Sequence, residues 1–427
     1  MRKDFLPVAV RTAEEGSAVL GLGPGRSMRL ALAVEEIFAY LCSSVREDRM
    51  LQFRLDSGGY FVQASFEFQA QDLNLHALNL TATATPDDED SLASLGLLVA
   101  SRTVDRFNVE RFGMGQVRIR LVQEKEYPAG RADSAEAACH APYRIVRTPA
   151  SGDLKLAVER AVAAYPSRLC PSGFQQPGKI VDMIAGGEYA AVMAADARGN
   201  PAGLLLWHFP GAQSSAFCGP YVWAQTPEER QQVALQLTDE FLSLVARTKA
   251  VCAFSELATP DLPEGYFESL GTLDVWSEAE GQVQQPAWYR YLREDLGAAV
   301  WAHPDVQPFL EEEYDRLVFV RDLRATRRQG ERISPFSVFA ADIQRDRQQV
   351  VLRALWDGLD IADNLAAHID VLRQENLRNV FFHLDLSQSW QADIAPALMA
   401  NGFAPRLILP YAGQSDIVVF QWAGAKA

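Results

Sequence analysis

The sequence predicts a multidomain chain of mixed α+β and α/β architecture. Its 427 residues are 48% apolar, which is enough material for two or three separate hydrophobic cores. Windows with helical periodicity alternate along the chain with windows of strand periodicity. A small, polar stretch at residues 125–141 has the composition of a linker. We therefore expect a first domain at 1–125, a linker at 126–142, a second domain at 143–293, and a third domain with a helical connector at 294–427.

The charge of the chain argues against two classes of partner. The formal net charge is −15 and the isoelectric point is near 5.0, so nucleic acid or an anionic membrane would repel it at long range. No apolar run approaches the roughly 20 residues that span a bilayer, and none follows the basic pair Arg2 and Lys3. We expect a cytoplasmic protein with no nucleic-acid or membrane partner.

Cysteine and histidine usage indicates reduced thiols and no metal site. The five cysteines are scattered, odd in number, and form no Cys-x-x-Cys pair. The six histidines are equally dispersed, and none lies at metal-ligand spacing from another histidine or a cysteine. We therefore expect neither a disulfide framework nor a bound zinc ion.

The first 125 residues predict helix, hairpin, helix and strand in that order. Residues 27–45 place Leu30, Val34, Ile37 and Leu41 on one helical face. Apolar residues alternate at 51–55 and again at 62–68, on either side of a turn at 56–59. A second helix is expected at 91–106, and the strand at 117–121 closes the region.

This order, and the segment from Leu30 to Leu41, resembles the GHKL ATPases, in particular the serine-kinase anti-sigma factors. The first helix of that family carries Glu-x-x-x-Asn, and its asparagine holds the magnesium ion that neutralises the ATP phosphates. Here Glu36 stands at the acid and Tyr40 at the asparagine. A phenol does not supply the amide oxygen in the same geometry.

Two further motifs of the resemblance are also partial. The family's Asp-x-Gly-x-Gly motif receives adenine, and here Asp72 is the nearby candidate, with no glycine following it until Gly96. Gly96 is one glycine of the two that normally cradle phosphates. The resemblance thus implies a nucleotide site of Glu36, Tyr40, Asp72 and Gly96, with Glu36 as general base. The structural alternatives are a solvated helix carboxylate, a turn aspartate at Asp72 and a small packing residue at Gly96.

The second region predicts alternating strands and helices. A strand begins at 143 and a helix follows at 152–165. A hairpin joins strands at 189–195 and 202–209. Next come a strand at 215–223, a long helix at 227–248, a strand at 250–254, a short helix that ends at 266–271, and a final strand at 288–293.

That order resembles the GNAT acyltransferase fold, whose Tyr-x-x-x-Gly-Phe piece has a near copy in Tyr266 to Thr272. The resemblance would place Tyr221, Val222 and Trp223 at an acyl-CoA site. The stretch that should hold the pyrophosphate, residues 226–234, has no glycine, and it brings Glu228 and Glu229 to the start of the helix. These acids suit the first turn of a helix better than an anion site.

Residues 337–422 repeat the same kinds of element, which predicts a second GNAT-like domain. Strands are expected at 337–342, 348–356, 380–385 and 416–422, with helices at 364–375 and 394–403. This copy also lacks a glycine-rich loop.

Three functions follow. The first is a bacterial regulatory protein that binds a protein partner through a degenerate nucleotide-binding domain and GNAT-like binding domains, with weak or no catalysis. The second is an acyl-CoA-dependent N-acyltransferase with a non-standard CoA loop. The third is a residual ATP-dependent serine kinase that uses Glu36. ATP with magnesium, or acetyl-CoA, is the cofactor that these alternatives require, and the oligomeric state is left open.

Overall fold

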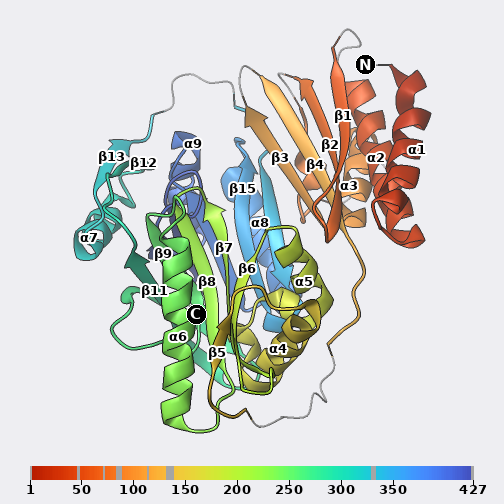
Figure 1. Ribbon diagram of the computed structural model, residues 1–427. Helices are drawn as coiled ribbons and strands as arrows, with labels where there is room; N and C mark the ends of the chain where they lie inside the picture. Colours follow the sequence, from red (N-terminus) through yellow and green to blue (C-terminus); the bar gives the residue numbers. More distant parts are fainter. Residues whose placement is uncertain are drawn as a thin grey trace. The chain divides into compact units, whose positions relative to one another are not determined.

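The computed structural model describes residues 2–45, 49–70, 73–82, 89–112, 115–130, 139–327 and 333–424, and Figure 1 shows the elements. Several sheets and many helices confirm the predicted multidomain chain of mixed α/β structure. The chain divides into two compact units. Unit 1 comprises Met1–Glu126, Gln329–Asp342 and Leu352–Asn376, and unit 2 comprises Tyr127–Arg328, Ile343–Val351 and Leu377–Ala427.

Unit 1 contains an antiparallel four-stranded sheet of order β1-β2-β4-β3, in which β1 is an edge strand. Its elements are α1 (Leu6–Val19), α2 (Pro24–Ser44), β1 (Leu51–Ser57), β2 (Phe61–Gln69), α3 (Glu89–Thr103), β3 (Arg106–Phe112) and β4 (Gln116–Glu124). The predicted first helix, hairpin and closing strand are confirmed. Helix α1 and strand β3 were not predicted.

The core of this sheet comes from the residues that periodicity selected. Leu30, Val34, Ile37 and Leu41 of α2 are fully buried, and they join the alternate apolar residues of β2 in one cluster. Burial of each such side chain contributes roughly 1.5–3 kcal/mol. Helix α1 escaped prediction because the residues that it buries, Ala9, Ala13 and Ser17, are small and make no apolar stripe.

Two later segments complete unit 1 and include α8 (Ile361–Gln374). The Asn79 amide donates to the Ser337 carbonyl over 2.8 Å, and its carbonyl oxygen accepts from the Phe339 N–H over 2.9 Å. The Asn364 amide also donates to the Ser337 carbonyl, over 3.1 Å. A short polar side chain after the first hairpin therefore fixes a backbone segment some 260 residues later.

Unit 2 contains a seven-stranded sheet of order β10-β11-β9-β8-β7-β6-β5. Strands β8 and β9 run parallel and are joined by α6, whereas the other paired strands that the structure describes in this sheet run antiparallel. The elements are β5 (Arg144–Val146), α4 (Ser151–Ala164), α5 (Pro177–Ala185), β6 (Ala190–Ala195), β7 (Pro201–Gly211), β8 (Ser214–Val222), α6 (Pro227–Val245), β9 (Cys252–Ala258), β10 (Glu268–Ser277) and β11 (Gly281–Tyr291).

The short helix predicted to end at residues 266–271 is wrong. This segment leaves a loop and enters β10, which pairs with β11 as a long hairpin. Pro263 interrupts any helix there, and Gly265 adopts a φ of +77°, a left-handed conformation that favours glycine. The piece that resembled the GNAT closing helix is therefore strand and loop.

The remaining strands form two further sheets. A parallel pair joins β12 (Ala298–Ala302) and β13 (Arg321–Ala325), with α7 (Gln307–Leu317) between them. A five-stranded sheet has the order β14-β15-β16-β18-β17. Its strands are β14 (Val338–Gln344), β15 (Gln349–Trp356), β16 (Asn379–Asp385), β17 (Phe403–Leu409) and β18 (Ile417–Trp422), and the short helices α9 (Ser389–Ala392) and α10 (Ala395–Ala400) lie before β17. Strands β14 and β15 contribute residues to both units.

Within the described ranges, no helix is both long and apolar enough to cross a membrane.

Candidate functional site

The predicted magnesium position, Tyr40, makes a bond within its own chain. Its side chain is buried in α2, and its hydroxyl donates to the Asn74 carbonyl over 2.7 Å. Burial raises the pKa of the phenol, so it stays neutral at physiological pH. Tyr40 therefore ties the segment after the first hairpin to the helix.

Glu36 and Gly96, two residues of the predicted nucleotide site, lie together at the contact of α2 with α3. A Cβ on Gly96 would fall 2.5 Å from Glu36 Oε2, the mobile end of that side chain, so glycine leaves room for the carboxylate in this position. Glu36 itself is half-buried. The proximity is compatible with both the functional and the structural interpretation. Asp72, the predicted adenine contact, lies outside the described residues.

In unit 2, the predicted acyl-CoA residues end β8, and side chains of the same unit already occupy their polar groups. The Val222 N–H donates to the Tyr165 hydroxyl over 2.7 Å, and the Val222 carbonyl accepts from Arg230 Nη1 over 2.8 Å. Arg230 also pairs with Asp261, which accepts a hydrogen bond from Tyr165. Both backbone groups of Val222 are thus used before any ligand arrives.

The neighbours of Val222 follow the same pattern. The Tyr221 side chain is fully buried, and its hydroxyl donates to the Leu169 carbonyl over 2.6 Å. The Trp223 N–H donates to the Ala202 carbonyl, while its indole N–H is buried without a partner among the described residues. That orphaned donor is the one buried side-chain polar group of the three residues that lacks a partner in the described part of the chain.

The start of α6, where an acyl-CoA enzyme would hold the pyrophosphate, is closed by a capping box. Thr226 Oγ1 accepts from the Glu229 N–H, and Glu229 Oε2 accepts from the Thr226 N–H. Glu228 lies exposed in the same turn. The predicted role of these acids as helix stabilisers agrees with this geometry, because donors and helix dipole are already matched by carboxylates.

A bulge in β9 turns Glu256 out of the regular ladder. Between two pairs of the parallel β8–β9 ladder, β8 advances two residues, from Ala216 to Cys218, while β9 advances three, from Phe254 to Leu257. Ser255 braces the extra residue, since its hydroxyl donates to the Phe217 carbonyl over 2.6 Å and accepts from the Leu257 N–H. Bulges of this kind re-aim one side chain, and they recur beside active sites.

The carboxylate of Glu256 is enclosed by protein but has no hydrogen-bond partner or ion pair among the described residues. The residue as a whole is half-buried. Burial raises its pKa to about 7, and the charge of Arg347 offsets this only in part. At neutral pH the group is therefore divided between its protonated and charged forms, which suits ligand binding or proton transfer.

Arg347 approaches Glu256 from the turn between β14 and β15. Its guanidinium donates to the Ser167 carbonyl over 3.0 Å, and to the carbonyls of Arg168 and Cys170. Burial lowers its pKa. These carbonyls and the Gln344 side chain, which also accepts from the guanidinium, are uncharged partners. The charge of Asp346 acts on Arg347 as well, but no carboxylate among the described residues forms an ion pair with it.

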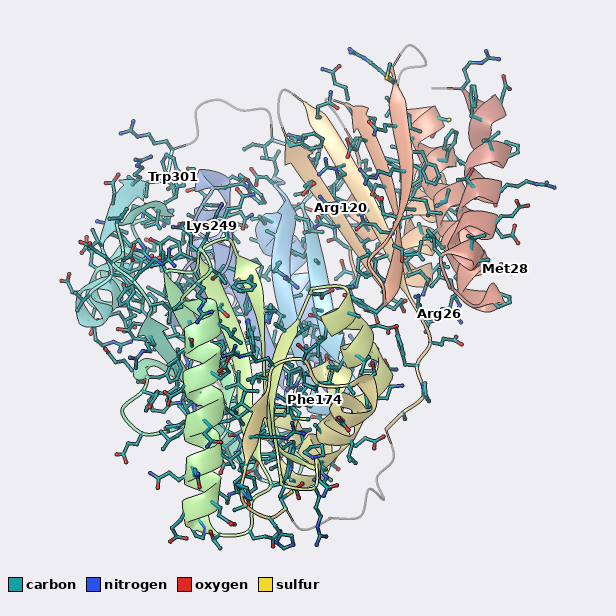
Figure 2. All side chains as sticks on the ribbon, viewed as in Figure 1. Arg26, Met28, Arg120, Phe174, Lys249 and Trp301 are labelled. Carbon is teal, nitrogen blue, oxygen red and sulfur yellow. The ribbon has the colours of Figure 1, made fainter. Side chains whose placement is uncertain are left out.

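Buried residues of β8 and of the segment before α5 surround Arg347. Burial raises the pKa values of Cys170 and Cys218 to about 12, and it raises that of Tyr221 as well. The ring of Phe174 lies 5.5 Å from that of Tyr221, and Figure 2 shows its position. We call Cys170, Cys218, Tyr221, Glu256 and Arg347 the Glu256 cluster. Its thiols are inert at neutral pH, and Glu256 is the member of the cluster whose pKa lies near 7.

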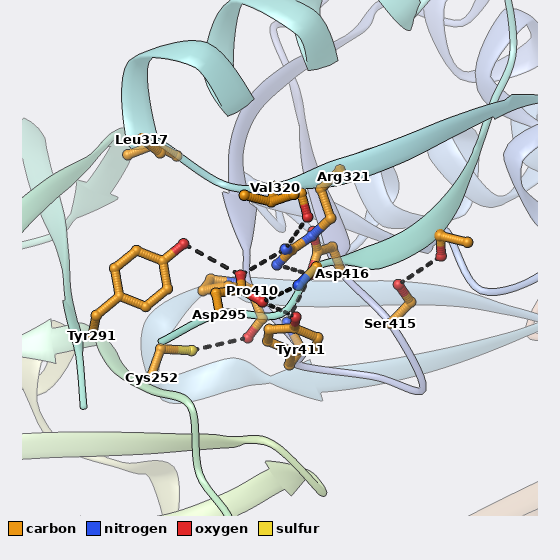
Figure 3. Close-up of polar contacts among 12 residues, drawn as sticks. Cys252, Tyr291, Asp295, Leu317, Val320, Arg321, Pro410, Tyr411, Ser415 and Asp416 are labelled. Atoms are coloured by element: carbon orange, nitrogen blue, oxygen red, sulfur yellow. Dashed lines mark hydrogen bonds and ion pairs between the residues drawn. The ribbon is translucent and has the colours of Figure 1, made fainter. Parts of the chain in front are cut away.

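A second buried arginine in unit 2 has very different partners. Arg321 lies between two carboxylates, with Nε 2.6 Å from Asp416 Oδ2 and Nη1 2.7 Å from Asp295 Oδ2 (Figure 3). Tyr411 supports both acids, because its hydroxyl donates to Asp295 and its N–H donates to Asp416. The guanidinium also lies 4.5 Å from the centre of the Tyr411 ring. We call Asp295, Arg321, Tyr411 and Asp416 the Arg321 cluster.

Both carboxylates of the Arg321 cluster are satisfied. Burial alone would raise the pKa of Asp295, but the hydrogen bonds from Tyr411 and Arg321 outweigh it and lower that pKa. The side chains of Arg321 and Asp416 are fully buried, so the cluster offers no surface to a ligand. It is a structural clamp.

Across the described part of the chain, no three His, Cys, Asp or Glu side chains are grouped so that they could hold a metal ion.

Sequence reasoning missed Glu256, Arg347 and Tyr165. The predicted strand stopped at Phe254, two residues before Glu256, although an acid at the end of an apolar strand was a usable signal. No local signal marks the other two residues, because Arg347 reaches carbonyls about 180 positions away and Tyr165 reaches Val222 57 positions away.

No family model matches the chain, and no curated protein does. The GHKL and GNAT resemblances therefore stay predictions.

Some solved structures resemble part of the chain. A putative acetyltransferase from Acinetobacter baylyi shares 10% identity at a TM-score of 0.28, over 35% of this chain and 93% of its own. An acetyltransferase of the GNAT family from Staphylococcus aureus shares 10% identity at a TM-score of 0.27, and the match covers 36% of this chain and 100% of that one. A putative acetyltransferase of the GNAT family from Desulfovibrio desulfuricans shares 17% identity at a TM-score of 0.25, and the match covers 36% of this chain and 99% of that one. With TM-scores below 0.5, these likenesses carry no argument about this chain.

Proposed function

We propose that this chain is a regulatory binding protein whose GNAT-like module, residues 143–293, holds a small ligand at Glu256 and transfers no acyl group. The observation that carries this proposal is the occupation of Val222. Tyr165 and Arg230 take the N–H and the carbonyl that an extended cofactor arm would pair with along β8. An acyl-CoA would have to break these bonds and the Arg230–Asp261 ion pair to enter.

The pyrophosphate end supports the same conclusion. The N-terminal N–H groups of α6 are capped by Thr226, and Glu228 and Glu229 place negative charge where a phosphate would approach. A phosphate therefore loses the attraction that a bare helix start provides and meets repulsion.

The ligand of Glu256 is a small molecule that donates hydrogen bonds, such as a primary amine. A carboxylate with a pKa of about 7 and no partner gains from a cationic donor, which would complete its coordination and favour its charged form. Amines that also carry an acceptor group match the neighbouring Arg347.

For residues 1–125 we propose a GHKL-like domain retained for a protein partner and not for phosphoryl transfer. Tyr40 stands where the family's magnesium ligand stands, and its hydroxyl is committed to Asn74. Glu36 as a kinase base would lack the metal that the chemistry needs.

The second candidate, an N-acyltransferase, is favoured by one observation. A carboxyl group with a pKa of about 7 is well matched to a general base that takes a proton from an attacking amine. Glu256 would then be the catalytic residue.

One pair of assays separates the two functions. Thermal unfolding is followed with acetyl-CoA and with a panel of primary amines, and CoA release is measured with both present. The variants are Glu256→Gln and a matched control, Glu264→Gln, at an exposed acid. We expect no shift with acetyl-CoA, no CoA release, and an amine-induced shift that Glu256→Gln abolishes and Glu264→Gln keeps. CoA release that depends on Glu256 would establish the acyltransferase instead.

A further inference from the structure

The edge strand β1 carries free backbone groups. The Gly58 N–H donates to the Phe61 carbonyl, which closes the β1–β2 hairpin and sets which residues of β1 bond to β2. Bonded positions alternate in an antiparallel ladder, so residues 52, 54 and 56 face β2. The N–H and carbonyl groups of residues 51, 53, 55 and 57 point to the open edge, and none of them has another partner among the described residues.

The same edge borders an apolar pocket. One recess, of about 430 Å³, lies in unit 2. A second recess, of about 410 Å³, is apolar and is formed by α1, α2 and β1. Its lining includes Phe5, Val8, Phe38, Leu51 and Phe53. Phe5 and Val8 are 58% and 61% exposed, which is unusual for side chains of their size. Apolar side chains beside β1 are therefore left partly exposed.

The two faces of β1 differ in character. Leu51, Phe53 and Leu55 pack against the core cluster, while Arg54 and Asp56 lie on the opposite, exposed face. Arg54 and Asp56 pair with each other along the strand, with Nε 2.8 Å from a carboxylate oxygen. An edge with free groups, an uncovered apolar side and balanced charges is a template for another strand.

We propose that β1 pairs antiparallel with β1 of a second copy of this chain, about a two-fold axis at Leu55. In this register Arg54 of each copy faces Asp56 of the other, so the charges match twice. Residues 53, 55 and 57, whose backbone groups are free, become the hydrogen-bonded positions. The added strand and the α1 that precedes it close the open side of the pocket.

Charge selects this register over its neighbours. Moving the axis to residue 54 sets Arg54 opposite Arg54, and moving it to residue 56 sets Asp56 opposite Asp56. Like charges facing each other across strands are destabilising. Moving it to Phe53 sets Asp56 opposite Met50 and leaves both charges unmatched. The pairing at Leu55 is the register that satisfies Arg54 and Asp56 together.

The test is the mass of the full chain by sedimentation equilibrium, with a charge swap. We expect the wild type to approach twice the 47.2 kDa of one chain as concentration rises. Arg54→Asp and Asp56→Arg each place like charges in contact twice, and each should weaken dimerisation by about tenfold or more. The double variant Arg54→Asp/Asp56→Arg restores the match and should dimerise like the wild type.

Arg247→Asp, an exposed site in unit 2, makes the same charge change and serves as the control. Circular dichroism checks that every variant is folded. A wild type that stays monomeric at its highest soluble concentration overturns the proposal. So does a dimer that the two single variants leave unchanged, since its interface would then lie elsewhere.

Discussion

Two buried arginines of unit 2, Arg321 and Arg347, show how different partners give the same side chain different roles. Arg321 contacts two carboxylates directly, at 2.6 and 2.7 Å, and an aromatic ring lies against it. Arg347 contacts backbone carbonyls, and the nearby acid, Glu256, stays unpaired. All charged groups around Arg321 have partners, whereas the acid near Arg347 has none and titrates near pH 7.

The two clusters shift the pKa values of their acids in opposite directions. In the Arg321 cluster, hydrogen bonds lower the pKa of Asp295 despite its burial, so the charge is permanent at neutral pH. In the Glu256 cluster, burial raises the pKa of Glu256 to about 7. A charge that is fully satisfied holds a fold together, whereas an enclosed and unsatisfied one is available for a ligand.

The largest expected effect comes from breaking the clamp. Arg321→Ala leaves Asp295 and Asp416 buried without their cation, and it should lower the free energy of unfolding by about 3–5 kcal/mol. Urea unfolding of the full chain measures this. The control is Arg324→Ala on the same strand, where an exposed pair with Asp322 is worth about 0–1 kcal/mol. Equal losses in the two variants would mean that the Arg321 cluster is no clamp.

A smaller and opposite effect is expected for Glu256→Gln. An acid with a pKa near 7 in the folded chain and 4.5 in the unfolded chain binds more protons when folded between those pH values. The wild type therefore loses stability as pH rises from about 4.5 to 7, by at most about 1.4 kcal/mol for each pH unit. Glutamine lacks this loss.

The two proteins should thus agree near pH 4.5, while the variant is more stable by at most about 3 kcal/mol above pH 7. Unfolding curves across this range, with Glu264→Gln as control, measure the difference. A difference that is constant with pH would show that Glu256 does not titrate in this window.

The smallest effect tests the network beside the Glu256 cluster. Tyr165→Phe removes the acceptor of the Val222 N–H and a partner of Asp261, and it should cost about 1–2 kcal/mol. Tyr266→Phe removes an exposed hydrogen bond to Asp239 and should lower the free energy of unfolding by much less than Tyr165→Phe does. If Tyr165→Phe also produced a thermal shift with acetyl-CoA, then Tyr165 alone would be what closes the CoA position.

Local periodicity predicted much of the fold and little of the site. The apolar stripe of α2, the first hairpin and the long helix α6 follow from spacing alone, because each buries one face of a regular element. The bulge that aims Glu256 depends on pairing between strands that no spacing records. The carbonyls that hold Arg347 come from a distant segment, so its role exists only in the folded chain.

The sequence motifs predicted some of the residues near the candidate sites but not their roles. Glu36 and Gly96 were chosen for a nucleotide site, and the structure brings them together at a helix contact. Of the residues chosen for acyl-CoA, Tyr221 belongs to the Glu256 cluster, and its hydroxyl and the backbone groups of Val222 bond within the fold. The buried indole N–H of Trp223 has no partner among the described residues. The sequence argument selected the end of β8, whereas Glu256, the residue with the raised pKa, lies on the neighbouring strand β9.

The most direct test is a carboxyl ¹³C NMR titration of the full chain, with Glu256→Gln to assign the signal. We expect one glutamate carboxyl signal to titrate near pH 7 and to be absent from the variant, while the Asp295 carboxyl titrates below the usual pKa of an aspartate. A Glu256 signal that titrates at or below 4.5 would contradict the account, because this acid would then be as satisfied as those around Arg321.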